Sequence, residues 1–77
     1  MNNNRYEFGH RLRTARKHKG LSGYKLAMML DVESPNVTHW ENGRSYPRID
    51  TLIRLSEMLE VSLDWLLVGQ EVNHDQT

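Results

Sequence analysis

Apolar side chains recur along most of this chain at intervals of three and four residues, the spacing of amphipathic helices. Over residues 5–19, Phe8, Leu12 and Ala15 form one apolar stripe, and Gly20 is suited to end the helix. Arg11 lies off that stripe, on a face that we expect to be solvated. The pattern therefore predicts a first helix with one buried side.

Two short helices follow with a sharp corner between them. Ser22 is a suitable N-cap for the first of these. Its inward-facing positions are Leu26, Ala27 and Leu30. At the corner we expect a left-handed backbone, which Asp31 tolerates better than most residues. The next helix starts at residue 33 or 34, takes Pro35 in its first turn, where a missing N–H costs nothing, and ends before Gly43.

Residues 44–48 read as a loop, because Gly43 and Pro47 bracket them. Asp50 is expected to cap a fourth helix. The inward positions of that helix are Leu52, Leu55 and Leu59. Ser62 caps a short fifth helix over residues 63–68, which Gly69 ends. No strand pattern competes with this series, so the sequence predicts an all-α, compact five-helix domain over residues 1–69 and a flexible polar tail over residues 70–77.

Length and composition narrow the class of protein. A chain of 77 residues holds one domain at most, and a core this small favours short loops and a tight helical bundle. There is no cysteine, which excludes disulfides and thiolate metal sites. No apolar run approaches the roughly 20 residues that span a bilayer, and the first residues lack the apolar stretch of a secretion signal. We therefore expect a soluble intracellular domain.

The formal net charge is zero, yet the charges are unevenly divided. Residues 1–48 hold nine of the ten Lys and Arg against four acidic residues, a net of +5. Residues 49–77 hold the tenth against six acidic residues, a net of −5. One half can attract phosphates while the other repels them, which would orient the molecule on a duplex. A chance division on a small solvated surface is the alternative.

The stretch from residue 22 to residue 43 carries the functional signal. A corner between two helices needs a small residue where they press together, and Ala27 supplies it. Val37 and Trp40, three residues apart, anchor one side of the second of these helices. The opposite side carries short or planar polar groups and one proline: Ser34, Pro35, Asn36, Thr38 and His39. Such groups can hydrogen-bond base edges or touch a thymine methyl in a DNA major groove.

With these residues in view, the chain resembles the lambda-repressor-like, Xre/Cro-type helix-turn-helix family of phage and bacterial transcriptional regulators. The resemblance covers about residues 6–69. It is carried by FGHRLRTAR (8–16), GLS (20–22), LA (26–27), VTHWENG (37–43), Pro47, Leu52 and VSLDWLL (61–67). The ordered set at this spacing is specific, although no single piece decides it. The resemblance implies a DNA-binding domain of the bacterial cytoplasm or nucleoid.

The resemblance also implies roles for individual residues. Arg16 and Glu41 match a partly buried ion pair that links the first helix to the third. Asn42 matches a residue that usually contacts phosphate. Arg44 and Arg48 occupy a loop that commonly meets the DNA backbone or the neighbouring minor groove. Base edges are usually faced by the positions of Ser34, Pro35 and His39.

One departure affects the expected contacts. The family often has glutamine where Gly23 stands, and that side chain touches a phosphate or supports a reading residue. Gly23 offers only its backbone N–H, so the contact is weaker or comes from Tyr24 or Lys25.

The fifth helix leaves two alternatives open. Its Trp65 can pack into the core of one subunit or lie in a seam between two subunits, since so short a helix cannot bury all its apolar residues. The candidates for a dimer interface are Trp65, Leu66 and Val68.

The leading hypothesis is a sequence-specific, double-stranded-DNA-binding transcriptional regulator of the phage or prophage repressor type, acting as a homodimer on a palindromic operator. The alternative is a protein-interaction module of the same fold, of the antitoxin or anti-repressor type. An enzyme is not expected, because no nucleophile–base pair, phosphate loop or paired carboxylates can be read. No metal, cofactor or small-molecule ligand is expected, since the four histidines lack ligand spacing.

Overall fold

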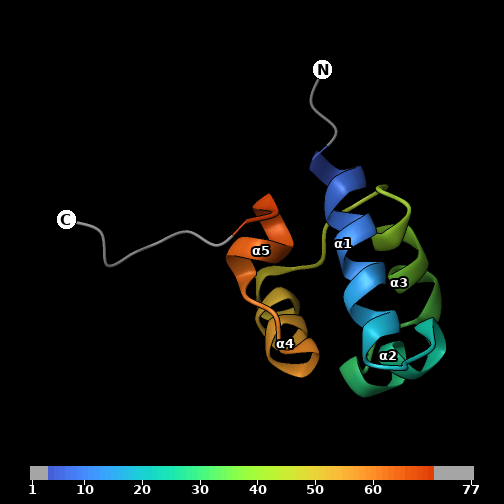
Figure 1. Ribbon diagram of the computed structural model, residues 1–77. Coiled ribbons are helices and arrows are strands. Elements are labelled where there is room, and N and C mark those ends of the chain that lie inside the picture. Colours follow the sequence, from blue (N-terminus) through green and yellow to red (C-terminus); the bar gives the residue numbers. More distant parts are fainter. Residues whose placement is uncertain (1–3, 71–77) are drawn as a thin grey trace.

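The structure is a computed structural model, and it describes residues 4–70 of the chain. The described part consists of five α-helices, with no strand among them (Figure 1). Their bounds are α1 Asn4–His18, α2 Gly23–Leu30, α3 Ser34–Glu41, α4 Ile49–Leu59 and α5 Leu63–Val68. The predicted all-α class is confirmed. Residues 71–77 of the expected polar tail lie outside the described residues.

The corner between α2 and α3 has the local geometry that the sequence predicts. The Ser22 hydroxyl accepts a hydrogen bond from the backbone N–H of Lys25 at 3.0 Å, which caps α2. Asp31 ends α2 in the left-handed region, with φ 59° and ψ 46°. The chain therefore turns sharply at Asp31, and α3 begins three residues later, at Ser34.

The start of α4 differs from the prediction. Arg48 is the N-cap and Ile49 the first helical residue, so Asp50 already lies inside the first turn. The Asp50 carboxylate accepts the N–H of the adjacent Thr51 at 2.9 Å and leaves the cap position to an extended Arg48. The prediction that Asp50 caps this helix is wrong. A carboxylate in the first turn still interacts favourably with the helix dipole.

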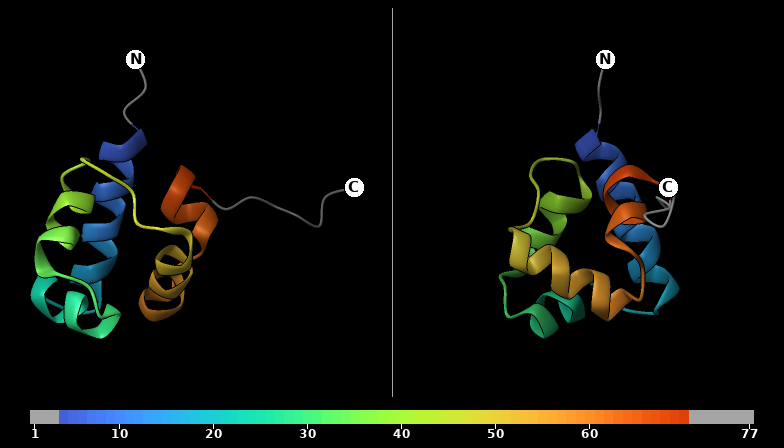
Figure 2. Two further views of the ribbon diagram at one scale, coloured as in Figure 1. Left: turned by 180° about the vertical axis from the view of Figure 1, so that it is seen from behind. Right: turned by 90° about the vertical axis from the view of Figure 1, so that its left-hand side faces the viewer.

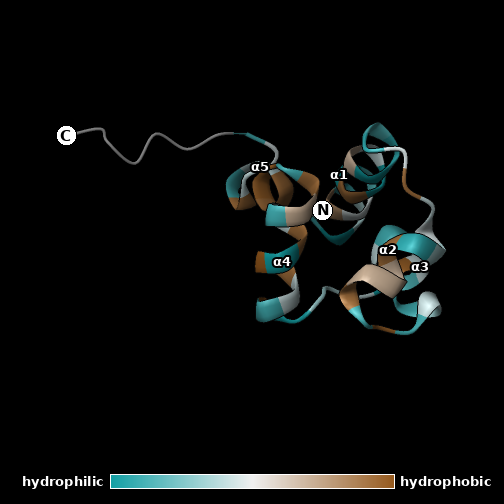
Figure 3. Cartoon of the chain, turned by 90° about the horizontal axis from the view of Figure 1, so that it is seen from below, coloured by the Kyte–Doolittle hydropathy of each residue, from teal (hydrophilic) through white to brown (hydrophobic). Residues whose placement is uncertain are grey.

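The helices form two groups around a common core. In Figures 1 and 2, α1 and α3 run side by side with α2 across one end, while α4 and α5 cover the other side. All five helices contribute to the core, which contains Phe8, Leu12, Ala15, Leu26, Ala27, Leu30, Val37, Trp40, Leu52, Leu55, Leu59 and Leu66. Figure 3 shows the helices as two-sided, with hydrophilic stretches beside apolar ones. The predicted inward faces are therefore the buried faces.

Two arginines hold helix ends that lie far away in the sequence. The Arg11 guanidinium donates to the carbonyl oxygens of Leu66 and Leu67 at 2.9 and 3.0 Å, and so ties the end of α5 to α1. Arg54 on α4 donates in the same way to the carbonyls of residues 29 and 30, at the end of α2. The last carbonyls of a helix lack partners within it, and a guanidinium satisfies them. The expectation that Arg11 lies on a solvated face is therefore wrong.

Gly9 allows α1 and α3 to approach closely. A Cβ atom on Gly9 would lie 2.5 Å from the carbonyl oxygen of Trp40 and 2.6 Å from that of Glu41. Both atoms belong to the backbone, which cannot move aside as a flexible side chain can. The absence of a side chain at Gly9 thus sets the distance between the two helices.

Candidate nucleic-acid interface

One side of α3 is fixed to the core. Val37 and Trp40 are 2% and 6% exposed, and both pack in the apolar core. Gly43 ends the helix with φ +77°, its N–H donating to the Trp40 carbonyl while the N–H of Arg44 donates to the His39 carbonyl. This pair of bonds is the Schellman arrangement that closes many helices. The two predicted anchors of α3 are confirmed.

A partly buried ion pair holds the same side of α3 to α1. The Arg16 Nε and Nη2 donate to the two carboxylate oxygens of Glu41 at 2.7 and 3.0 Å, with side chains 11% and 9% exposed. Arg16 Nη1 donates to the Leu21 carbonyl at 2.8 Å. The hydrogen bond that Arg16 donates to Glu41 raises the pKa of Arg16, so the guanidinium stays charged until strongly alkaline pH. The Arg16–Glu41 ion pair that the family resemblance implies is therefore present.

The opposite side of α3 presents a row of side chains to solvent. Pro35, Thr38 and Asn42 are exposed and His39 is half-buried. We call these four positions the outward row. Thr38 and His39 are adjacent, Pro35 and Asn42 lie three or four residues from each of them, and all four share one helix face. Among residues 4–70, no hydrogen bond or ion pair joins their side chains to another group. The outward row therefore offers a hydroxyl, an imidazole, an amide and an apolar ring to an external partner.

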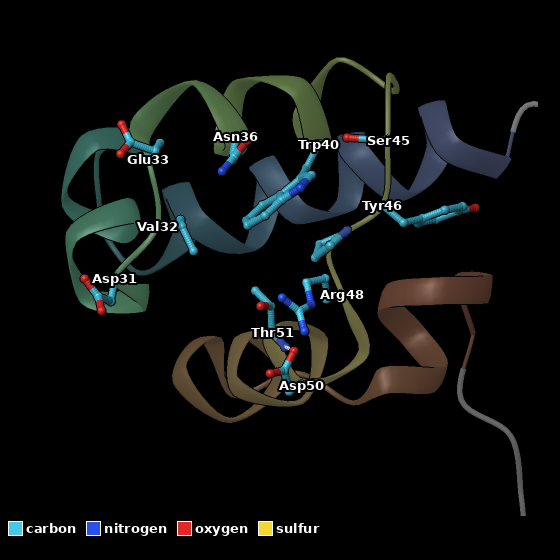
Figure 4. Close-up of a pocket in the computed structure, with 11 residues that line it drawn as sticks. Asp31, Val32, Glu33, Asn36, Trp40, Ser45, Tyr46, Arg48, Asp50 and Thr51 are labelled. Atoms are coloured by element: carbon cyan, nitrogen blue, oxygen red, sulfur yellow. Dashed lines mark hydrogen bonds between the residues drawn. The ribbon is translucent and has the colours of Figure 1, made fainter.

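Ser34 and Asn36 border this row on its two sides. Ser34 is half-buried. Asn36 lines a polar cleft of about 600 Å³, together with Trp40 of α3 and Thr51 of α4. In Figure 4, Asn36 and Trp40 point from α3 toward the side on which Thr51 and Arg48 lie. The sequence groups Asn36 with the base-reading residues, whereas the structure places it over this cleft at the edge of the row.

The candidate phosphate-binding side chains lie at the start of α2 and in the loop after α3. Tyr24 and Lys25 are exposed in the first turn of α2, and Arg44 and Arg48 are exposed in the loop after α3. A Cβ on Gly23 would lie 3.8 Å from Val37 Cγ1, an ordinary contact. The space at that position therefore admits a side chain.

The predicted dimer candidates divide into three environments. Val68 is 60% exposed, and Trp65 is half-buried and packs against the core. Leu66 is fully buried in the core of this chain, so its side chain offers no surface to a second copy. Trp65 and Val68, three residues apart, share one side of α5, whereas Leu66 lies about 100° from Trp65 around the helix and takes the core position.

No group of three or more His, Cys, Asp or Glu side chains within residues 4–70 is placed to hold a metal ion. No helix in this range has the length and apolar character needed to cross a membrane.

The sequence interpretation missed how α1 holds the loop after α3. Arg5 Nη1 donates to the Arg44 carbonyl at 3.1 Å, and the Phe8 and Tyr46 rings lie 5.2 Å apart between centroids. Tyr6 packs on Gly43, where an added Cβ would meet its ring at 3.0 Å. These contacts join residues about 40 positions apart, so no local sequence pattern predicts them.

Comparison with known proteins identifies the family. The family model described as Helix-turn-helix matches residues 12–66. This chain belongs to the helix-turn-helix family. The P22 c2 repressor, solved in complex with a synthetic operator, is 32% identical to it with a TM-score of 0.77, covering 82% of this chain and 96% of that one. The restriction-modification controller protein C.AhdI from Aeromonas hydrophila has a TM-score of 0.71 at 30% identity over 79% and 92% of the two chains. The predicted lambda-repressor-like fold is confirmed.

Curated relatives of this helix-turn-helix chain include the transcriptional activator BcrR of Enterococcus faecalis. It is 35% identical over 66 residues, which are 86% of this chain and 32% of BcrR. The chain spans between 32% and 63% of the lengths of the curated relatives that it matches. The similarity therefore concerns the helix-turn-helix domain of those proteins.

Proposed function

We propose that the chain is a sequence-specific, double-stranded-DNA-binding domain of a transcriptional regulator, which inserts α3 into the major groove. The observation that carries this proposal is the two-sidedness of α3. Val37, Trp40 and Glu41 tie one side to the core, while the outward row has no intramolecular partner among the described residues. An exposed helix of this kind is suited to the width of a B-DNA major groove.

Each group in the outward row has a chemical counterpart on DNA. The ring of Pro35 and the methyl group of Thr38 suit thymine methyls, and the His39 imidazole can hydrogen-bond a base edge. Asn42 at the end of α3, with Arg44 after it, can contact phosphates and fix the register of the helix. Ser34 and Asn36 lie at the edges of the row, where they reach bases beside those that its centre contacts.

The domain acts by occupying its site, without catalysing a reaction, in the bacterial cytoplasm. Support for an operator comes from the P22 c2 repressor, whose structure includes one. We propose a homodimer that places two α3 helices about 34 Å apart on a palindromic operator, the separation of successive major grooves. Trp65 and Val68 remain the candidates for its seam.

Selection of duplexes from a random pool tests the proposal. A bound consensus with two inverted half-sites, about one helical turn apart, is the expected result. Enrichment of no sequence would contradict sequence-specific reading. A gel shift on random duplex at low salt distinguishes this proposal from the alternative, a protein-interaction module of the same fold. A DNA-binding domain shows at least weak non-specific affinity under these conditions.

A further inference from the structure

Two arginines from distant parts of the chain meet beside the C-terminal end of α3. Arg5, in the first turn of α1, donates from Nη1 to the backbone carbonyl of Arg44 at 3.1 Å. The backbone N–H of Arg44 donates to the His39 carbonyl at 2.9 Å, so this residue is held on both sides. Both arginine side chains are exposed. The Arg5 guanidinium and the backbone of Arg44 are thereby fixed where the outward row ends.

Within the described residues, no acid neutralises this Arg5–Arg44 pair. The ion pairs of residues 4–70 join Arg16 to Glu41 and Lys19 to Glu60. The positions three and four residues after Arg5 hold Phe8 and Gly9, so no ion pair along α1 is available to it. Within residues 4–70, the pair therefore carries two exposed positive charges that no acid pairs, and Arg5 uses one N–H group in the bond to Arg44.

The position of Arg5 argues against the explanation that its side chain serves only to hold the loop after α3. A cation in the first turn of a helix lies at the positive end of the helix dipole, where its charge is unfavourable. The exposed side chain of Arg44 brings a second positive charge to the same region, and like charges repel. A bound anion removes both costs, and the nearest anion to the end of a reading helix is a phosphate of the DNA backbone.

We propose that Arg5 and Arg44 together bind the phosphate backbone at the C-terminal end of α3, which makes the first turn of α1 part of the DNA interface. This inference rests on the proposed function and adds to it a residue that the helix-turn-helix segment does not contain. The contact is sequence-independent, since phosphates carry no base identity. It lies next to Asn42 and extends the outward row beyond the helix.

Salt-dependent binding of the full chain tests the inference, measured by fluorescence anisotropy on random duplex and on a selected operator. Each lost phosphate contact reduces the slope of log K against log salt by about 0.9. We expect Arg5→Gln to reduce the slope by that amount and to weaken binding about tenfold on both duplexes. Arg5→Lys keeps the charge and should retain most of the slope. Arg13→Gln removes another exposed charge from α1 and serves as the matched control.

The double variant separates a direct contact from mere positioning of Arg44. If both arginines bind phosphate, Arg5→Gln with Arg44→Gln lowers the slope by about 1.8. An Arg5→Gln change that has no further effect beside Arg44→Gln overturns the proposal, as does a wild-type slope or an equal loss in Arg13→Gln. Thermal unfolding of each variant checks that the fold is kept. Absence of wild-type binding at low salt is a separate outcome, and it would reject the proposed function itself.

Discussion

The two sides of α3 differ in how completely their groups are paired. Toward the core, the backbone of α3 packs on Gly9 of α1, Trp40 is buried, and both carboxylate oxygens of Glu41 accept hydrogen bonds from Arg16. Toward solvent, the side chains of the outward row have no partner within residues 4–70. The helix α3 together with its C-cap Asn42 thus carries a structural side and a binding side. Substitutions on the structural side should destabilise the domain. Substitutions on the binding side should leave the domain folded but weaken DNA binding.

The largest expected effect lies at the crossing of α1 and α3. Gly9→Ala places a Cβ within 2.6 Å of two backbone oxygens, so the helices must separate. We expect the free energy of unfolding to fall by about 3 kcal/mol or more, at the upper end of overpacking effects. Urea unfolding followed by circular dichroism measures this change.

Gly23→Ala is the matched control for that experiment. Its Cβ meets only Val37, at 3.8 Å, and Gly23 is a helical residue without positive φ. Alanine there should raise stability by about 0.5–1 kcal/mol through helix propensity. Equal effects of the two substitutions would show that no close crossing exists.

The second effect concerns the ion pair. Glu41→Ala leaves the charge of Arg16 largely buried and without its carboxylate, and we expect a loss of about 3 kcal/mol in unfolding free energy. Arg16→Met combined with Glu41→Leu removes both charges and should recover at least half of this loss, since apolar pairs often replace buried ion pairs. A double variant as unstable as Glu41→Ala would argue against a stranded charge as the cause.

A smaller effect is expected on the binding side. His39→Ala should weaken binding to the selected operator about tenfold, the size of a lost base contact, while binding to random duplex changes little. The melting temperature should stay close to that of the wild type, because surface substitutions alter stability by about 0.5 kcal/mol or less. His10→Ala, at an exposed position on α1, is the control. Equal losses on both duplexes would reject a reading role for His39.

The smallest effect is a gain. Gly23→Gln fits the available space and supplies an amide at the start of α2. Affinity for operator and random duplex should rise about threefold, within the range of one net hydrogen bond. Comparison with Gly23→Ala separates the new contact from helix stabilisation. No gain over Gly23→Ala would show that the start of α2 does not approach phosphate.

Features set by neighbouring residues could be predicted from the sequence. The caps at Ser22 and Ser62, the left-handed Asp31 and the buried Val37 and Trp40 all depend on positions a few residues apart. The start of α4 was predicted wrongly, because Asp50 carries a capping side chain while the backbone begins the helix at Ile49. Cap residues act only where the backbone supplies the geometry.

Contacts between distant segments could not be predicted from the sequence. The bond from Arg11 to the end of α5 spans 55 positions, and the approach of Gly9 to α3 depends on how two helices cross. The same limit applies to Arg5, whose partner lies 39 positions away. The predicted binding face, by contrast, followed from the period of α3 alone, apart from the placement of Asn36 over the cleft.

Backbone amide chemical shifts, followed by NMR during titration with the selected duplex, test most directly whether α3 presents its outward row to DNA. We predict the largest shifts over residues 34–45 and at the start of α2, and small shifts over the outer face of α4. Largest shifts at Ile53 and Glu57 on α4, with α3 unaffected, would contradict the account.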